Sequence, residues 1–177
     1  EPDRYCASEL VLIDAHFEAG NLGKGSVTDN GDFVLTLFPE DDPPINRSTW
    51  FAYRVSGQAG DTVNIRMNFK HGYARYWPKY SLDGDSLERI NEELVSIGAE
   101  KEWMEIRLPL MQSNVWVAGQ EIFDSGDYDR WLQKLAARDE IETRLLGASV
   151  EGRPIYLAET ADKPEFILFM GRQHPPE

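Results

Sequence analysis

The segment from Thr62 to Phe69 alternates apolar and polar side chains without a break. A two-residue period predicts a strand with one face in a core and the other in water. The odd positions should therefore point inward and the even positions outward: Val63, Ile65, Met67 and Phe69 against Asn64, Arg66 and Asn68. We expect Trp50, Tyr53 and Val55, or their neighbours of opposite parity, to share this core.

Shorter segments of strand-like sequence surround this one. They cover residues 10–18, 33–38, 50–55, 103–108 and 115–117. Turn-forming stretches rich in Gly, Asn, Asp or Ser separate them, at residues 20–32, 57–61 and 112–114. Short strands punctuated in this way predict an antiparallel β-sandwich over residues 1–122.

Two segments have helical spacing instead. Leu87, Ile90, Leu94 and Ile97 predict a short inserted helix over residues 86–97, with Asp85 or Ser86 as its N-cap. A second helix is predicted to begin near Ser125 or Asp127 and to run through Ala137. Its apolar positions recur at i, i+3, i+4 and i+7: Tyr128, Trp131, Leu132 and Leu135.

The end of the chain predicts a different architecture. Residues 145–150 and 154–159 flank a tight turn at 151–153, and residues 165–170 are apolar on both faces. Such a strand belongs in a sheet covered on both sides, so residues 123–177 are predicted to begin an α/β domain. One helix covers one face only. We therefore expect residues 165–170 to be covered by a second copy in a homo-oligomer, by a missing C-terminal portion or by the β domain.

Charge and composition exclude several kinds of partner. A formal net charge of -13, with no run of Lys and Arg, disfavours nucleic acid and anionic membrane surfaces. Apolar runs are far shorter than the roughly 20 residues of a membrane-spanning helix. Cys6 is the one cysteine, so no internal disulfide can form. The start at Glu1 fits a removed secretory signal or a trimmed chain, and of these we favour an exported or periplasmic protein.

His174 and Glu177 form a His-x-x-Glu motif directly after the apolar run. Ligands bind at the carboxyl ends of strands in open α/β sheets. An imidazole and a carboxylate three residues apart can both reach one Zn²⁺, and Pro175 and Pro176 stiffen the loop between them. This geometry suits two of the three protein ligands of a zinc site, and the alternative interpretation of the same spacing is a solvated His174 near the end of the chain. His16 and His71 have no second ligand at useful spacing and are expected to touch no metal.

Several motifs together resemble one enzyme family. The string from Leu146 to Leu157, Leu-Gly-Ala-Ser-Val-Glu-Gly-Arg-Pro-Ile-Tyr-Leu, followed by a strand and His174-x-x-Glu177, resembles the start of the catalytic domain of the carboxypeptidase A superfamily. The helix at residues 128–135 is similar to that family's opening helix. The motifs at 17–22 and 50–56 resemble the β-sandwich domain that precedes the catalytic domain in cytosolic-carboxypeptidase-like members.

This resemblance implies a zinc metallocarboxypeptidase that hydrolyses C-terminal peptide bonds of peptides and proteins. His174 and Glu177 would bind Zn²⁺, and a histidine about a hundred residues further on would be the third ligand. The general-base Glu and the Arg that binds the substrate carboxylate would also lie beyond Glu177. Pro176 stands where the family commonly has Gly. We expect the chain by itself to be inactive and to bind zinc poorly, because a catalytic site needs three protein ligands.

A different class of function is a non-catalytic β-sandwich that binds ligands or acts like a chaperone. Tyr73, Tyr76, Trp77 and Tyr80, if exposed, could form a carbohydrate- or peptide-binding patch. Such a cluster more often packs at a domain interface. A gene that continues past codon 177 with a histidine after another strand favours the enzyme, whereas a stop codon favours the binding module.

Overall fold

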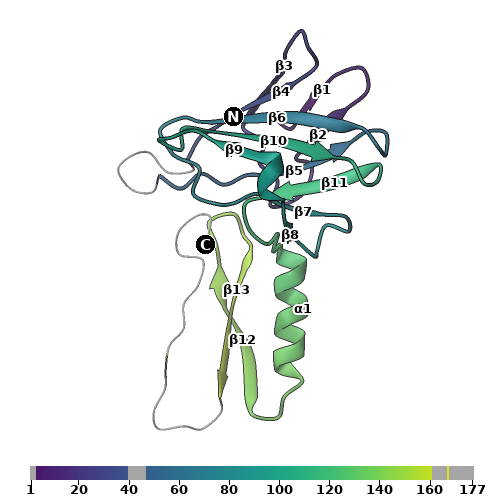
Figure 1. Ribbon diagram of the computed structural model, residues 1–177. Coiled ribbons are helices and arrows are strands. Elements are labelled where there is room, and N and C mark those ends of the chain that lie inside the picture. Colours follow the sequence, from purple (N-terminus) through teal and green to yellow (C-terminus); the bar gives the residue numbers. More distant parts are fainter. Residues whose placement is uncertain (1–2, 40–46, 161–166, 168–177) are drawn as a thin grey trace. The chain divides into compact units, whose positions relative to one another are not determined.

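The computed structural model describes residues 3–39, residues 47–160 and Ile167. The described chain divides between Ile122 and Phe123 into two compact units. We call them the N-terminal unit and the C-terminal unit, and each is described by itself (Figure 1).

The described part of the N-terminal unit forms two β-sheets packed as a sandwich (Figure 1). Its strand neighbours are antiparallel except for β4 and β6, which run parallel. The first sheet has the order β1 (Tyr5–Ala7), β2 (Leu12–Asp14), β5 (Ala52–Ser56), β11 (Asn114–Ala118), β7 (Lys79–Ser81), β8 (Glu88–Arg89). The second has the order β3 (Lys24–Val27), β4 (Phe33–Leu37), β6 (Thr62–Phe69), β10 (Trp103–Pro109), β9 (Val95–Ile97).

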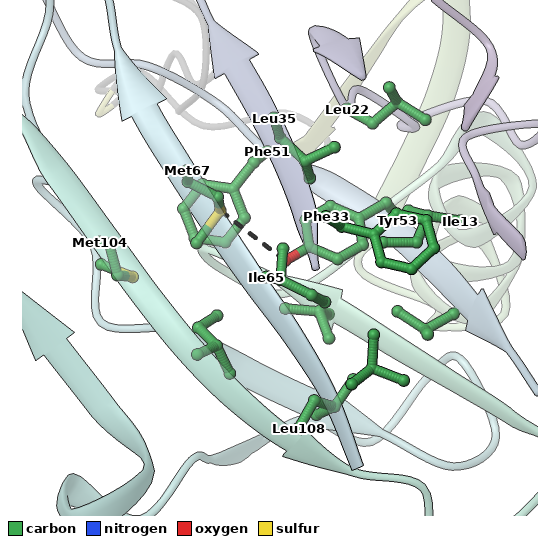
Figure 2. Close-up of a cluster of buried hydrophobic side chains, with 14 of the residues drawn as sticks. Ile13, Leu22, Phe33, Leu35, Phe51, Tyr53, Ile65, Met67, Met104 and Leu108 are labelled. Carbon is green, nitrogen blue, oxygen red and sulfur yellow. Dashed lines mark hydrogen bonds between the residues drawn. The ribbon is translucent and has the colours of Figure 1, made fainter. Parts of the chain in front are cut away.

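The predicted register of β6 is confirmed. Its four odd-numbered apolar residues are all buried, Asn64 is exposed, and Arg66 and Asn68 are half-exposed. Tyr53 and Val55 of β5 face the same core, where large buried side chains of both sheets meet (Figure 2). The Trp50 side chain does not join this core. It is buried in a smaller cluster with Ala52 and Ala118. The alternation that begins just before β5 therefore places Phe51, not Trp50, in the main core.

Tyr53 carries a hydroxyl group into this apolar core. The residue is fully buried, and among the described residues its hydroxyl donates to the Met67 thioether sulfur alone, at 3.7 Å (Figure 2). Burial raises the pKa of the Tyr53 hydroxyl, so the group stays neutral. Sulfur is a weak hydrogen-bond acceptor. The bond to Met67 therefore offsets little of the free energy that it costs to remove the hydroxyl from water.

We predict that Tyr53→Phe changes the free energy of unfolding by less than about 1 kcal/mol and in the stabilising direction, because it deletes a poorly compensated polar group and keeps the ring. Tyr53→Leu, which also deletes ring atoms from the core, should destabilise by about 2 kcal/mol or more. Urea unfolding of both variants measures this. A large loss of stability in Tyr53→Phe would show that the hydroxyl has a stronger partner.

The helix predicted over residues 86–97 is wrong. This segment contains β8, a 3₁₀ turn at Glu92–Leu94 and β9, so the chain crosses from the first sheet to the second. Asn91 caps the short turn by accepting the N–H of Glu93. Pairing of β8 with β7 and of β9 with β10 supplies backbone hydrogen bonds and burial that a short isolated helix lacks.

A polar turn directs the chain into this crossing. The backbone N–H of Ser86, the Ser81 hydroxyl and the backbone N–H of Asp85 all donate to the Asp83 carboxylate, and these bonds hold its pKa well below the usual range. Gly84 adopts a left-handed backbone, with φ of 89°, under the ring of Trp116. Side-chain hydrogen bonding to the backbone therefore competes with helix formation at the position where we predicted an N-cap.

The C-terminal unit contains α1 (Ser125–Ala136), β12 (Ile141–Ala148) and β13 (Pro154–Thr160), so the predicted helix and hairpin are confirmed. Asp124 and Asp127 form a capping box at the start of α1. Tyr128 of α1 packs near Tyr156 of β13, with ring centroids 6.5 Å apart. Within residues 123–160, however, Leu132 is the one buried apolar side chain. This described part lacks a core of its own.

Large apolar side chains of this unit are exposed: Trp131, Leu145, Leu146, Val150 and Ile155. No helix among the described residues has the length and apolar character needed to cross a membrane.

Candidate functional site

The two predicted zinc ligands, His174 and Glu177, lie outside the described residues, as does the apolar run at 165–170 apart from exposed Ile167. A neutral imidazole and a carboxylate are donors that Zn²⁺ accepts, so this pair fits the metal by type, and a third ligand is needed. Among residues 3–39 and 47–160 no group of three or more His, Cys, Asp or Glu side chains could hold a metal. The assignment of His174 and Glu177 therefore stays a prediction.

His16 and His71, which we expected not to bind metal, lie in separate places. His16 is exposed, and its Nδ1 lies 3.8 Å from the Asp14 carboxylate. His71 is in the loop after β6, where its carbonyl accepts a hydrogen bond from Arg47 Nε at 3.3 Å.

The two upstream motifs that resemble the carboxypeptidase N-terminal domain lie against each other. The Asn21 side chain donates to the Trp50 carbonyl at 2.9 Å and accepts from the Gly23 N–H at 3.0 Å. The Asn21 backbone exchanges hydrogen bonds of 2.8 and 3.0 Å with Ala52. The Trp50 indole N–H donates back to the Ala19 carbonyl at 2.7 Å. We call this arrangement the Asn21–Trp50 junction.

Two glycines allow the chain to approach this closely. A Cβ at Gly20 would lie 2.5 Å from the Ala15 carbonyl oxygen, and one at Gly23 would lie 2.1 Å from the Thr36 carbonyl oxygen. Gly23 also has a φ of 68°, which non-glycine residues adopt only with strain. Backbone geometry therefore explains the two glycines, Gly20 within the motif at 17–22 and Gly23 just after it.

Asp14 forms a buried ion pair beside this junction. Its carboxylate is 1% exposed and accepts two hydrogen bonds from Arg54, at 3.0 and 2.9 Å, and one from the His16 N–H at 3.1 Å. The Arg54 guanidinium lies 5.9 Å from the Trp116 ring centre. These contacts satisfy a buried charge and join β2, β5 and β11 across the outer face of the first sheet.

The Asn21–Trp50 junction and the Asp14–Arg54 pair stabilise the fold. The side chains of Asn21 and Trp50 in the junction form hydrogen bonds with backbone groups. The Asp14 carboxylate is paired with Arg54.

Asn21→Ala should destabilise the N-terminal unit by about 2–3 kcal/mol, because it removes two hydrogen bonds and takes the side-chain donor away from the carbonyl of the buried Trp50. Thermal and urea unfolding measure the change. Asn64→Ala is the matched control: its amide bonds Asp32 at the exposed surface, and its loss should cost under about 1 kcal/mol. Equal effects of the two substitutions would contradict a special role for the junction.

The aromatic residues that we considered as an exposed binding patch are half-buried. The Trp77 indole N–H donates to the Ile90 carbonyl at 2.8 Å, and Arg89 stacks on its ring. The Tyr80 hydroxyl bonds Glu88 at 2.9 Å. The four side chains are therefore not fully exposed, and the crossing segment covers part of Trp77 and Tyr80.

Sequence reasoning missed the roles of Asn21 and Asp14. The available signal was an Asn between Gly20 and Gly23 and an Asp after the apolar residues 10–13. Both positions are typical of side chains that bond the backbone at a turn. Their partners are 29 and 40 residues away, and a single sequence does not connect them.

Solved structures of other proteins share the fold of this chain. A metallo-carboxypeptidase from Burkholderia cenocepacia superimposes with a TM-score of 0.67 at 18% identity, over 88% of this chain and 40% of that one. A metallo-carboxypeptidase from Pseudomonas aeruginosa, solved in complex with (2-guanidinoethylmercapto)succinic acid, gives a TM-score of 0.65 at 22% identity, over 86% and 41%. The chain thus spans about 40% of the length of each. A search of curated protein sequences gave no match.

The sequence also matches a family directly. The matched family is described as Cytosolic carboxypeptidase N-terminal domain, and the match covers residues 13–119. This range begins in β2, ends after β11 and includes the Asn21–Trp50 junction and the Asp14–Arg54 pair. The chain therefore belongs to the cytosolic carboxypeptidase N-terminal domain family.

Proposed function

We propose that this chain is the N-terminal portion of a zinc metallocarboxypeptidase, consisting of the β-sandwich domain and the first elements of the catalytic domain. The observation that carries the proposal is the order of parts along the chain. A cytosolic carboxypeptidase N-terminal domain at residues 13–119 is followed by α1, the β12–β13 hairpin and the His174-x-x-Glu177 motif.

The exposed apolar side chains of the C-terminal unit support this proposal. An isolated two-stranded hairpin is marginally stable at best, and α1 buries only Leu132 within the described residues 123–160. Leu145, Leu146 and Ile155 are 60%, 54% and 47% exposed. Burying such side chains is worth roughly 1.5–3 kcal/mol each. Additional strands and helices of a catalytic domain would supply that burial.

His174 and Glu177 would contribute two of the three protein ligands of the zinc ion. When bound in such a site, zinc polarises a carbonyl group and activates water for peptide hydrolysis. The substrates would be the C-termini of peptides and proteins. The residues that recognise the terminal carboxylate and act as general base would belong to the remainder of the catalytic domain.

Activity of the product of the whole reading frame tests the proposal. The gene is sequenced past codon 177 and the complete product is incubated with a panel of peptides, with released C-terminal amino acids measured by mass spectrometry. We expect release that stops on chelation and returns with Zn²⁺, and that is absent in His174→Ala. A frame that ends at codon 177, or release unaffected by His174→Ala, would contradict the proposal.

A further inference from the structure

Two dipeptides of this chain have the sequence that most readily closes into a cyclic succinimide, Asn30–Gly31 and Asp83–Gly84. In both, the second residue is glycine, which has no Cβ to hinder the approach of its backbone nitrogen to the preceding side-chain carbonyl carbon. No other Asn or Asp in the sequence precedes a glycine. The sequence therefore offers two candidate sites for the same modification, and the fold distinguishes between them.

Hydrogen bonds protect the second dipeptide from this reaction. The Asp83 carboxylate accepts three of them, from the Ser81 hydroxyl and two backbone N–H groups, at 2.8–2.9 Å. These bonds also lower the pKa of the Asp83 carboxyl, and an ionised carboxylate is a poor electrophile. The Gly84 N–H donates to Ser81 Oγ at 2.9 Å, so the attacking nitrogen is engaged as well. Asp83 is therefore exposed but unreactive.

The turn that joins β3 to β4 gives Asn30 much less protection (Figure 1). Gly31 has a φ of 85°, and its N–H donates to the Thr28 carbonyl at 2.9 Å, as is typical of a short hairpin loop closed on glycine. Asn30 and Gly31 are exposed, and a Cβ at Gly31 would have no described atom within 4 Å. Within residues 3–39 and 47–160, the Asn30 amide forms no hydrogen bond. One exposed turn bond is thus what opposes the reaction.

We propose that Asn30 is a site of spontaneous deamidation in the folded protein. The Gly31 nitrogen attacks the carbonyl carbon of the Asn30 side chain, and a new C–N bond closes the succinimide ring. The bond from that carbon to the amide nitrogen breaks, and ammonia leaves with the proton of the Gly31 nitrogen. Water then adds to either ring carbonyl and opens the ring, which gives aspartate or isoaspartate. Solvent water is the co-reactant, and no electrons are transferred.

Isoaspartate in this turn would change the hairpin locally. It adds one atom to the backbone between Thr28 and Asp32, which close the loop through a 2.9 Å bond from the Thr28 N–H to the Asp32 carbonyl. The new carboxylate joins Asp29 and Asp32, and the Asp32 carboxylate accepts the Asn64 amide of β6 at 2.8 Å. Because β3 is an edge strand and no residue of the turn belongs to the core, the rest of the sandwich should stay folded.

Peptide mapping of the 177-residue chain after prolonged incubation tests the proposal, with isoaspartate located by electron-transfer fragmentation and released ammonia measured. We expect conversion at Asn30 at a rate within about tenfold of that in an unfolded peptide of the same turn sequence, because one exposed hydrogen bond must open. Asn64 of the interior strand β6 is the internal control. Its reaction requires global unfolding and should be suppressed at least about a thousandfold.

Two variants test the part played by the hydrogen bonds. Thr28→Val removes the hydroxyl that accepts the Asp32 N–H and should speed conversion at Asn30 about threefold. Ser81→Ala removes two of the bonds that protect the other dipeptide and should make isoaspartate appear at Asp83. Failure of isoaspartate to appear there would contradict the protection assigned to the Ser81 hydroxyl.

Three further results would overturn the proposal. The first is an Asn30 that stays unmodified while the unfolded peptide converts completely, which would show that the turn blocks the reaction. The second is isoaspartate at Asp83 as fast as at Asn30 in the unaltered chain. The third is equal conversion of Asn30 and Asn64, which would indicate reaction through global unfolding instead of in the folded turn.

Discussion

Residues 1–122 produced alone are expected to unfold in one cooperative transition, whereas residues 123–177 alone are expected to show none. Every member of the main core, from Cys6 to Val117, lies in the N-terminal unit. The sandwich also has both lateral sides joined: Asp3 bonds the backbone of Gly23 and Gly25, and the 88–97 segment crosses between the sheets on the other side. The C-terminal unit has one buried apolar side chain within residues 123–160.

Urea unfolding followed by near-ultraviolet circular dichroism and tryptophan fluorescence compares the two pieces with the complete chain. The midpoint for residues 1–122 should fall close to that of the main transition of residues 1–177, because the core is the same. A molten N-terminal piece, or a cooperative C-terminal piece, would contradict the conclusion that the described hydrophobic core belongs to the N-terminal unit alone.

Gly23→Ala is expected to destabilise the N-terminal unit by at least about 4 kcal/mol, enough to leave many copies unfolded. The added methyl group would lie 2.1 Å from the Thr36 carbonyl oxygen, at a φ of 68°. Neither the backbone of β4 nor the Asn21 side chain that bonds the Gly23 N–H can shift without breaking other contacts.

Gly60→Ala is the matched control, because Gly60 has a φ of 98° and a methyl group added there would meet no atom within 4 Å among the described residues. Only backbone strain remains at this position, and the expected loss is about 1–2 kcal/mol. Thermal unfolding of the two variants separates strain from steric conflict. Equal destabilisation would show that the close approach of Gly23 to β4 contributes nothing.

Strong local patterns allowed correct prediction of the long elements. The eight-residue alternation of β6 predicted both its bounds and its buried face, and the spacing around Leu132 predicted α1. Short strands at the edges were less visible. β1, β3 and β8 have two to four residues, and β3 lies within a stretch that we interpreted as a loop. Their conformation depends on pairing partners distant in the sequence, as that of the 86–97 segment does.

The same difference between local patterns and contacts distant in the sequence applies to the candidate site. The spacing of His174 and Glu177 alone also suits a solvated histidine, so the resemblance of residues 146–177 to a carboxypeptidase motif selected this pair, and that interpretation stays a prediction. The Asn21–Trp50 junction arises from residues that only the fold brings together. Periodicity in one sequence reports which face of an element is buried. It does not report which loops meet.

Zinc content tests the central proposal most directly. The 177-residue chain and the product of the whole reading frame are dialysed against metal-free buffer, and metal is measured by mass spectrometry, with His174→Ala of the longer product as control. We predict about one zinc per molecule in the complete product, far less in the 177-residue chain, and far less in His174→Ala, because a catalytic zinc site requires three protein ligands. Stoichiometric zinc in the 177-residue chain, or zinc retained in His174→Ala of the complete product, would contradict the assignment of His174 and Glu177 to an incomplete carboxypeptidase site.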